Sequence, residues 1–120
     1  ETDISCDTAL LQLNGHDRFK RREGKYFTKV QRYQYHEGAG DVERRAAAGT
    51  ARADNSVPHV YSFALKPEEH QPSGTCNFSR IDNAVLNLEH ASATGKLHVY
   101  AVNYNVLRIM SGMGGLAYSN

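Results

Sequence analysis

The stretch Gln71–Asn83 reads QPSGTCNFSRIDN and holds the densest run of local structural signals in the chain. Pro72 fixes its own φ and lacks an N–H, so the Gln71, Pro72, Ser73, Gly74 run predicts a tight turn. After the turn, short polar residues interleave with the apolar residues Cys76, Phe78 and Ile81. This pattern predicts a half-buried strand entering directly from the turn. The stretch therefore marks a corner between two extended segments, and it carries no catalytic or metal-ligand pattern of its own.

Alternation of apolar and polar residues predicts strands on both sides of this corner. The predicted strands are Asp7–Asn14, His59–Leu65, Ala84–His90, Leu97–Met110 and Leu116–Ser119. Turn-forming residues separate them at Asn14-Gly15, Ala93–Lys96 and Ser111–Gly115. Four or five strands with long loops indicate an all-β chain, yet so few strands barely close two facing sheets. On physical grounds the chain is predicted to be part of a larger β-sandwich.

The bulk composition is that of one soluble globular domain. The chain has 120 residues, 40% hydrophobic and 22% charged, with a net charge of +1. No apolar run approaches the roughly 20 residues that cross a bilayer. No signal peptide is visible, and the missing initiator Met suggests a processed chain or a fragment. The two cysteines, Cys6 and Cys76, are expected to be reduced and buried.

A long loop region is expected at about 16–56. Its first part, 16–36, is basic and aromatic, with seven cations against two carboxylates and thus a local net charge of +5. We expect a loop there that holds a short helix or strand. The second part, 37–56, is rich in Ala, Gly and alternating charge, which predicts an exposed, mobile loop with room for one helical turn.

Three runs carry a recognisable likeness: LQLNGHDRF (Leu11–Phe19), YSFALKPEEHQPSGTCNFSRIDN (Tyr61–Asn83) and VYAVNYNVLRIMSGMGGLAYSN (Val99–Asn120). The chain resembles the C-terminal part of the major capsid protein of nucleocytoplasmic large DNA viruses, especially those of algae. Gln71–Gly74 then forms a family-signature turn. The segment 37–56 departs from the resemblance, because it is longer and richer in Ala and Gly than in compact members of the family.

The resemblance implies a fold and an assembly. Family members have two consecutive jelly rolls, so residues 1–120 would form a partial second jelly roll, and Asn120 would lie at or near the natural C-terminus. Three chains would form a capsomer, and capsomers would tile an icosahedral shell over an internal membrane. The implied partners are other copies, neighbouring capsomers and minor capsid proteins, without direct membrane insertion. The implied location is the virion, assembled in the host cytoplasm.

The basic stretch 16–36 admits two interpretations. Its cations could neutralise phosphates while its aromatics stack on bases, which would make the chain a nucleic-acid-binding β module. Alternatively, the aromatics pack inward and the cations face water or acidic surfaces of adjacent capsomers. Charge without a recognised motif favours the second interpretation, and an internal membrane would separate shell from genome. The candidate contact residues are Arg18, Arg21, Arg22, Lys25, Lys29 and Arg32.

No catalytic or cofactor role is predicted, and a cupin-like metal site is the weaker alternative. The six histidines, His16, His36, His59, His70, His90 and His98, are scattered and show no ligand spacing. His70 and Cys76 lie close in sequence, yet nothing orients them as a catalytic pair. Asn77-Phe78-Ser79 fits the N-glycosylation acceptor pattern, a weak signal. Arg80, Asp82 and Arg108 are expected to make ion pairs that fix register or an intersubunit contact.

Overall fold

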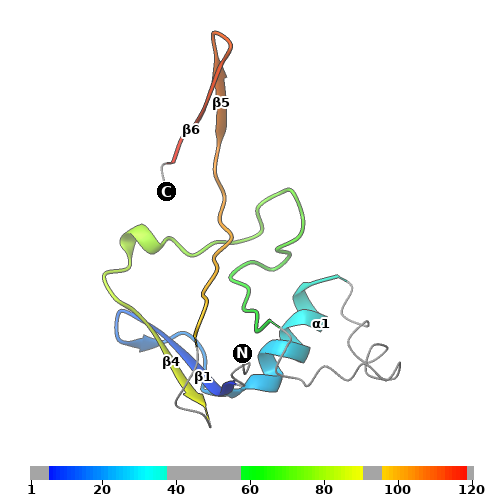
Figure 1. The fold of residues 1–120 in the computed structure, drawn as a ribbon, viewed down its shortest axis with the longest axis vertical. Helices are drawn as coiled ribbons and strands as arrows, with labels where there is room; N and C mark the ends of the chain where they lie inside the picture. The colour runs from blue at the N-terminus through cyan, green and yellow to red at the C-terminus, as the bar shows by residue number, and fades with distance from the viewer. Residues whose placement is uncertain (1–5, 38–57, 91–95, 119–120) are drawn as a thin grey trace.

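The computed structural model describes residues 6–37, 58–90 and 96–118, and they form a small sheet, a helical segment and a separate hairpin (Figure 1). The sheet holds β1 (Cys6–Leu13), β2 (His16–Asp17), β3 (Arg22–Glu23) and β4 (Ala84–His90). The hairpin holds β5 (Leu107–Met110) and β6 (Met113–Leu116). The helical elements are a π-helical turn (Tyr26–Val30), α1 (Gln31–Tyr35) and a 3-10 turn (Phe78–Arg80).

β1 organises the sheet. β4 pairs antiparallel along its whole length, from Cys6 opposite His90 to Leu13 opposite Ala84, with a register shift between Cys6 and Thr8. The short strands β2 and β3 pair with opposite ends of β1. The predictions of strands over Asp7–Asn14 and Ala84–His90 are thus confirmed, to within one residue at the ends.

The turn after β1 forms where the sequence predicts it. Asn14 and Gly15 have φ of +52° and +80°, and Leu13 lies opposite His16. Two consecutive residues with positive φ are typical of the type I′ turn of a two-residue hairpin. The Asn14 side chain also ties the hairpin to the end of the 71–83 stretch, because its Oδ1 accepts the N–H of Asp82 at 2.9 Å and of Asn83 at 3.2 Å.

A row of aromatic rings, of which Phe27 is buried, most others are half-buried and Phe78 is exposed, links the helical segment to residues 61–78. Phe19 lies 5.5 Å from Phe27 and 4.7 Å from Tyr61, measured between ring centroids. Tyr61 contacts Phe63 edge-on at 5.1 Å, and Phe63 contacts Phe78 at 5.8 Å. Among the described apolar side chains, only Ala9, Leu10 and Phe27 are buried. The core is therefore small, and it joins the helical segment to residues 61–78.

The prediction of a strand over His59–Leu65 is wrong. This segment follows no β-ladder in the described part of the chain, and its backbone turns instead toward the helical segment. Val60 N–H donates to the Phe27 carbonyl at 3.3 Å, and Ser62 N–H donates to Gln31 Oε1 at 3.4 Å. The alternation of Tyr61 and Phe63 reflects packing of rings rather than strand pairing.

The predicted half-buried strand after the Gln71–Gly74 turn is also wrong. Asn77 accepts the Ser79 N–H at 3.1 Å and so begins the one-turn 3-10 helix Phe78–Arg80. Such local side-chain bonds compete with a β-ladder for the same backbone groups. Cys76 is half-buried outside any strand, and Arg80 and Asp82 are exposed and share no strand face.

The C-terminal segment agrees only in part with its prediction. Of the expected strand Leu97–Met110, only Leu107–Met110 pairs, while residues 96–106 run extended without a ladder. The turn lies at Ser111 and Gly112, with φ of +52° and +76°. The last strand begins at Met113 instead of Leu116, because the glycines after this turn pair with β5.

Of the remaining expectations, some fall on described residues and can be compared with the structure, and others fall outside them. The basic stretch does hold short strands and helical turns, as expected. Cys6 and Cys76 are free thiols, half-buried instead of fully buried. The loop 37–56 and the Ala93–Lys96 turn lie almost entirely outside the described residues. No helix among the described residues is long and apolar enough to cross a membrane.

Produced alone, the 120-residue chain is expected to aggregate or to melt without cooperativity. Among the described residues only three apolar side chains are buried, which is too small a core to stabilise a domain. Large apolar side chains between Leu97 and Tyr118 are exposed and would promote association of unpaired strands. Circular dichroism during heating, together with size-exclusion chromatography, measures this. A soluble monomer with one sharp unfolding transition would contradict the expectation.

Candidate contact surface

The six predicted contact residues divide into exposed and half-buried side chains. Arg18, Arg22, Lys25 and Lys29 are exposed, whereas Arg21 and Arg32 are half-buried. They come from β3, its flanking loops, the π-helical turn and α1. Lys29, although exposed, already takes part in an interaction within the chain, so the candidates for an external partner are Arg18, Arg22 and Lys25.

Arg21 is a structural residue of the sheet. Its Nη1 lies 3.2 Å from Glu89 Oε1 and donates to Thr8 Oγ1 at 3.0 Å. Thr8 Oγ1 in turn donates to Glu89 Oε2 at 2.7 Å. The guanidinium therefore links the segment before β3 to β1 and β4. Arg21 therefore has a structural role in the sheet, and its role as an outward contact residue stays a prediction.

Arg22 is positioned by an aromatic ring. Its Cζ lies 5.2 Å from the centroid of Tyr26, a cation–π contact that holds the side chain beside the π-helical turn. Tyr26 itself accepts a hydrogen bond from Gln31 Nε2 at 3.0 Å. The Tyr26 ring, itself hydrogen-bonded to Gln31, thus restricts the position of the exposed Arg22 guanidinium.

The aromatic side chains of this stretch do not form a platform for bases. Phe27 is buried, and Phe19 and Tyr26 are half-buried within the aromatic row. Stacking on single-stranded nucleic acid needs exposed ring faces. Tyr33 is exposed, and one exposed ring does not make a stacking platform for successive bases. The arrangement matches the interpretation in which rings pack inward and cations face outward.

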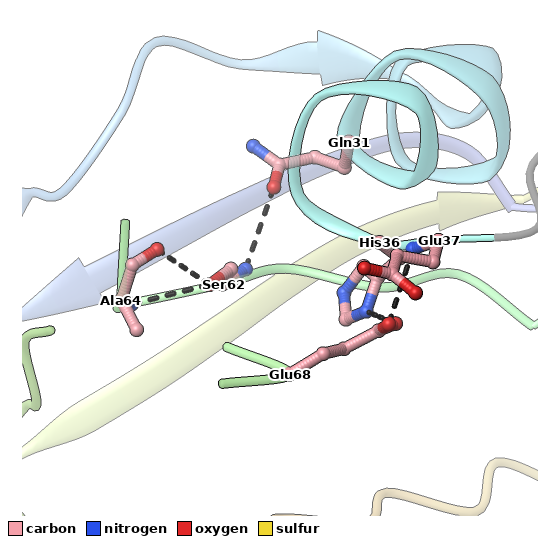
Figure 2. A network of polar contacts seen from close by, with 6 residues as sticks. All are labelled: Gln31, His36, Glu37, Ser62, Ala64 and Glu68. Atoms are coloured by element: carbon pink, nitrogen blue, oxygen red, sulfur yellow. Dashed lines mark hydrogen bonds and ion pairs between the residues drawn. The ribbon is translucent and has the colours of Figure 1, made fainter. Parts of the chain in front are cut away.

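A carboxylate clasp joins the end of α1 to the loop before the signature turn (Figure 2). His36 Nδ1 lies 2.9 Å from Glu68 Oε1, and Glu37 N–H donates to Glu68 Oε2 at 3.2 Å. The Glu37 N–H bond, followed by the His36 bond, lowers the pKa of the Glu68 carboxyl. The sequence indicated His36 only as a scattered candidate metal ligand, and no pattern in it pointed to this clasp.

A second polar link lies beside the clasp (Figure 2). Gln31 is buried, and its Oε1 accepts the Ser62 N–H while its Nε2 donates to Tyr26. Ser62 Oγ closes a local turn by donating to the Ala64 carbonyl at 2.8 Å. Gln31 therefore fixes residues 60–64 against the helical segment. No pattern in the sequence distinguishes Gln31 from an exposed helix residue.

The signature turn closes the loop 66–73. Ser73 Oγ accepts the Lys66 N–H at 2.8 Å and donates to the Lys66 carbonyl at 3.2 Å. Gly74 has a φ of +146°, and a Cβ there would lie 3.2 Å from the Phe63 carbonyl oxygen. The position therefore requires glycine. Gln71 and Pro72 are exposed, so the turn presents an outward surface.

The other candidates do not converge into a chemical site. The described residues contain no group of three or more His, Cys, Asp or Glu side chains that could hold a metal. Burial raises the pKa of the Cys6 thiol and lowers that of His59. Asn77 is exposed. Its Oδ1 bond to Ser79 N–H gives it a structural role, and glycosylation stays a prediction.

The family model and two relatives that match this chain are major capsid proteins of large DNA viruses. Residues 4–115 match the family model described as large eukaryotic DNA virus major capsid protein. The chain is 55% identical to a major capsid protein of Pyramimonas orientalis virus, across 100% of this chain and 33% of that protein. It is 48% identical to a major capsid protein of Paramecium bursaria Chlorella virus 1, across 95% of this chain and 28% of that protein.

A solved structure agrees. The fold resembles a chain of the quasi-atomic model of the PBCV-1 virus capsid, with a TM-score of 0.65 and 42% identity over 96% of this chain and 30% of that chain. This likeness confirms the predicted fold class, the C-terminal portion of a jelly-roll β-sandwich. The chain spans about a third or less of the relatives it matches.

Replacing Glu68 by Gln in the full-length protein is expected to lower the unfolding midpoint at neutral pH. The pKa of Glu68 is lower in the folded protein than its ordinary value of 4.5. The ionised carboxylate therefore stabilises the fold above pH 4.5, and this stabilisation is lost as the pH falls through the pKa of the folded state. The difference between Glu68→Gln and the wild type should therefore shrink below pH 4.5. Denaturant melts from pH 3 to pH 7 measure this.

Glu69→Gln is the matched control, because the ion pair of Glu69 with Lys66 stays within the loop. A Glu68→Gln difference that persists unchanged at pH 3, or a Glu69→Gln effect of equal size, would contradict the clasp.

Replacing Gly74 by Ala in the full-length protein is expected to cost about 1–3 kcal/mol of unfolding free energy, because a Cβ strains both the backbone and the Phe63 contact. Gly114→Ala is the control, since a Cβ there meets nothing within 4 Å. Equal losses for the two variants, measured by denaturant melts, would refute the constraint at Gly74.

Proposed function

Because the chain belongs to the family of large eukaryotic DNA virus major capsid proteins, we propose that it is a structural part of an icosahedral viral shell. The match of the family model over residues 4–115 carries this proposal. The role is mechanical and associative: two sheets fuse into a rigid slab, and loops present the contact surfaces. No catalytic role is proposed.

We propose that residues 1–120 form part of the second jelly roll of a double jelly-roll subunit, with a long loop region at about 16–56. Three subunits would form a capsomer, and the partners would be other copies, neighbouring capsomers and minor capsid proteins. The protein would reside in the virion after assembly in the host cytoplasm. Support comes from the relatives, which are named as capsid proteins.

We assign the external contacts to two neighbouring segments. One carries the exposed cations Arg18, Arg22 and Lys25. The other is the loop 66–75, whose exposed residues include Gln71 and Pro72. The Glu68 clasp ties this loop to the end of α1, and the Phe19–Tyr61 ring contact links the cationic segment to the residues that precede the loop. The cations suit acidic patches on adjacent capsomers, since opposite charges steer association.

Electron microscopy of the purified full-length protein tests the proposal. The expected particles are trimers with a pseudo-hexagonal outline, because family members assemble in that way. A monomer in which the strands of this chain close by themselves into an independent domain would contradict it.

Salt-dependent binding distinguishes the nucleic-acid alternative. That alternative predicts binding to DNA or RNA that weakens steeply with salt and is lost on charge reversal at Arg22 and Lys25. The capsid proposal predicts that these reversals change contacts between capsomers without any such binding. Arg21→Glu is unsuitable as a probe, because it would also break the ion pair with Glu89.

A further inference from the structure

The end of the β1–β2 hairpin carries an Asn-Gly pair that is bonded to the start of β4 (Figure 1). Asn14 and Gly15 hold the two turn positions with positive φ, and both are exposed. An asparagine loses its side-chain amide most readily when glycine follows it, because glycine has no Cβ to hinder attack by its own nitrogen. The space beside Gly15 is open, since a Cβ there would meet nothing within 4 Å.

The Asn14 side chain extends the ladder between β1 and β4 by one step. The last regular pair joins Leu13 and Ala84. Beyond it, the Asn14 N–H donates to the Asn83 carbonyl at 2.8 Å. Asn14 Oδ1 accepts the Asn83 N–H at 3.2 Å and the Asp82 N–H at 2.9 Å. The side-chain carbonyl thus does at this step what a main-chain carbonyl does in a regular ladder.

These bonds also restrict the side-chain amide carbon. Cyclisation requires the main-chain nitrogen of Gly15 to reach Asn14 Cγ. While Oδ1 is bonded to the N–H groups of Asp82 and Asn83, Cγ is held toward the start of β4. The reaction therefore needs the hairpin end to detach first. Detachment is a local opening, because the bonds that must break are exposed and lie at the end of the ladder.

We propose that Asn14 is a deamidation site gated by its contact with residues 82–83. In the opened hairpin the Gly15 nitrogen loses its proton, attacks Asn14 Cγ and expels the side-chain nitrogen as ammonia, which leaves a five-membered succinimide. Water then opens the ring at one of its two carbonyls and gives aspartate or isoaspartate at position 14. The inference is independent of the proposed capsid function.

The two products differ in their effect on the hairpin. An aspartate keeps an acceptor for the N–H groups of Asp82 and Asn83, although it places a second carboxylate beside Asp82. An isoaspartate lengthens the main chain by one carbon, so the chain no longer fits a two-residue type I′ turn. That product makes the detachment permanent, and it separates β2 from the end of the 71–83 stretch.

Incubation of the full-length protein at mildly alkaline pH, followed by peptide mapping, tests the proposal. One sample is folded, a second is unfolded in urea, and Asn105 is the internal control in both. Asn105 Oδ1 also holds two N–H groups, of Val106 at 2.8 Å and Tyr118 at 3.1 Å, but valine follows it instead of glycine. We expect Asn14 to convert about tenfold more slowly in the folded sample, the equivalent of roughly 1.4 kcal/mol of opening free energy. Asn105 is expected to keep its amide in both samples.

The variant Asp82→Pro gives a second measurement, because proline has no N–H to donate to Asn14. Asn14 is expected to convert several-fold faster in the folded variant than in the folded wild type, while the rates in urea agree. Two results would overturn the proposal. Equal rates in the folded and unfolded wild type would show that the contact is no gate. An Asn14 that keeps its amide in urea as long as Asn105 would show that the site does not react.

Discussion

The row of aromatic rings in tilted and edge-on contact is the interaction on which the described structure depends. Phe19, Phe27 and Tyr61 bring together the basic segment and the 58–65 segment, which lie far apart in sequence. Phe63 and Phe78 extend the row to the signature turn. Tilted and edge-on ring pairs add to the burial of apolar area and constrain geometry. Polar links then orient the elements that the rings hold together.

This small interior determines what the chain can do. The outer edge of β4 and residues 96–106 follow no further ladder among the described residues, and large apolar side chains from Leu97 onward face outward. Such surfaces need covering by other polypeptide. The relatives are three or more times longer than this chain, and in them further polypeptide is present that could cover such surfaces. The exposed apolar surface is therefore the physical reason why the chain is not expected to fold stably by itself.

The sequence predicted what is local. Alternation located β1 and β4, and the pair Asn14-Gly15 located the turn between β1 and β2, because side-chain period and turn chemistry depend on neighbours in the chain. It did not predict that residues 59–65 bond to the helical segment, because alternation does not identify the partner. Nor did it predict the Glu68 clasp or the pairing of Arg21 with Glu89, since each joins residues more than 30 positions apart.

We propose that other polypeptide, of the same subunit or of a neighbouring copy, completes the sheet around residues 96–118. Hydrogen exchange of the full-length assembled protein, followed by mass spectrometry of a peptide that spans residues 97–104, tests it most directly. The account predicts slow exchange there, because each amide would enter a covered ladder. Exchange as fast as in an unstructured peptide would contradict it.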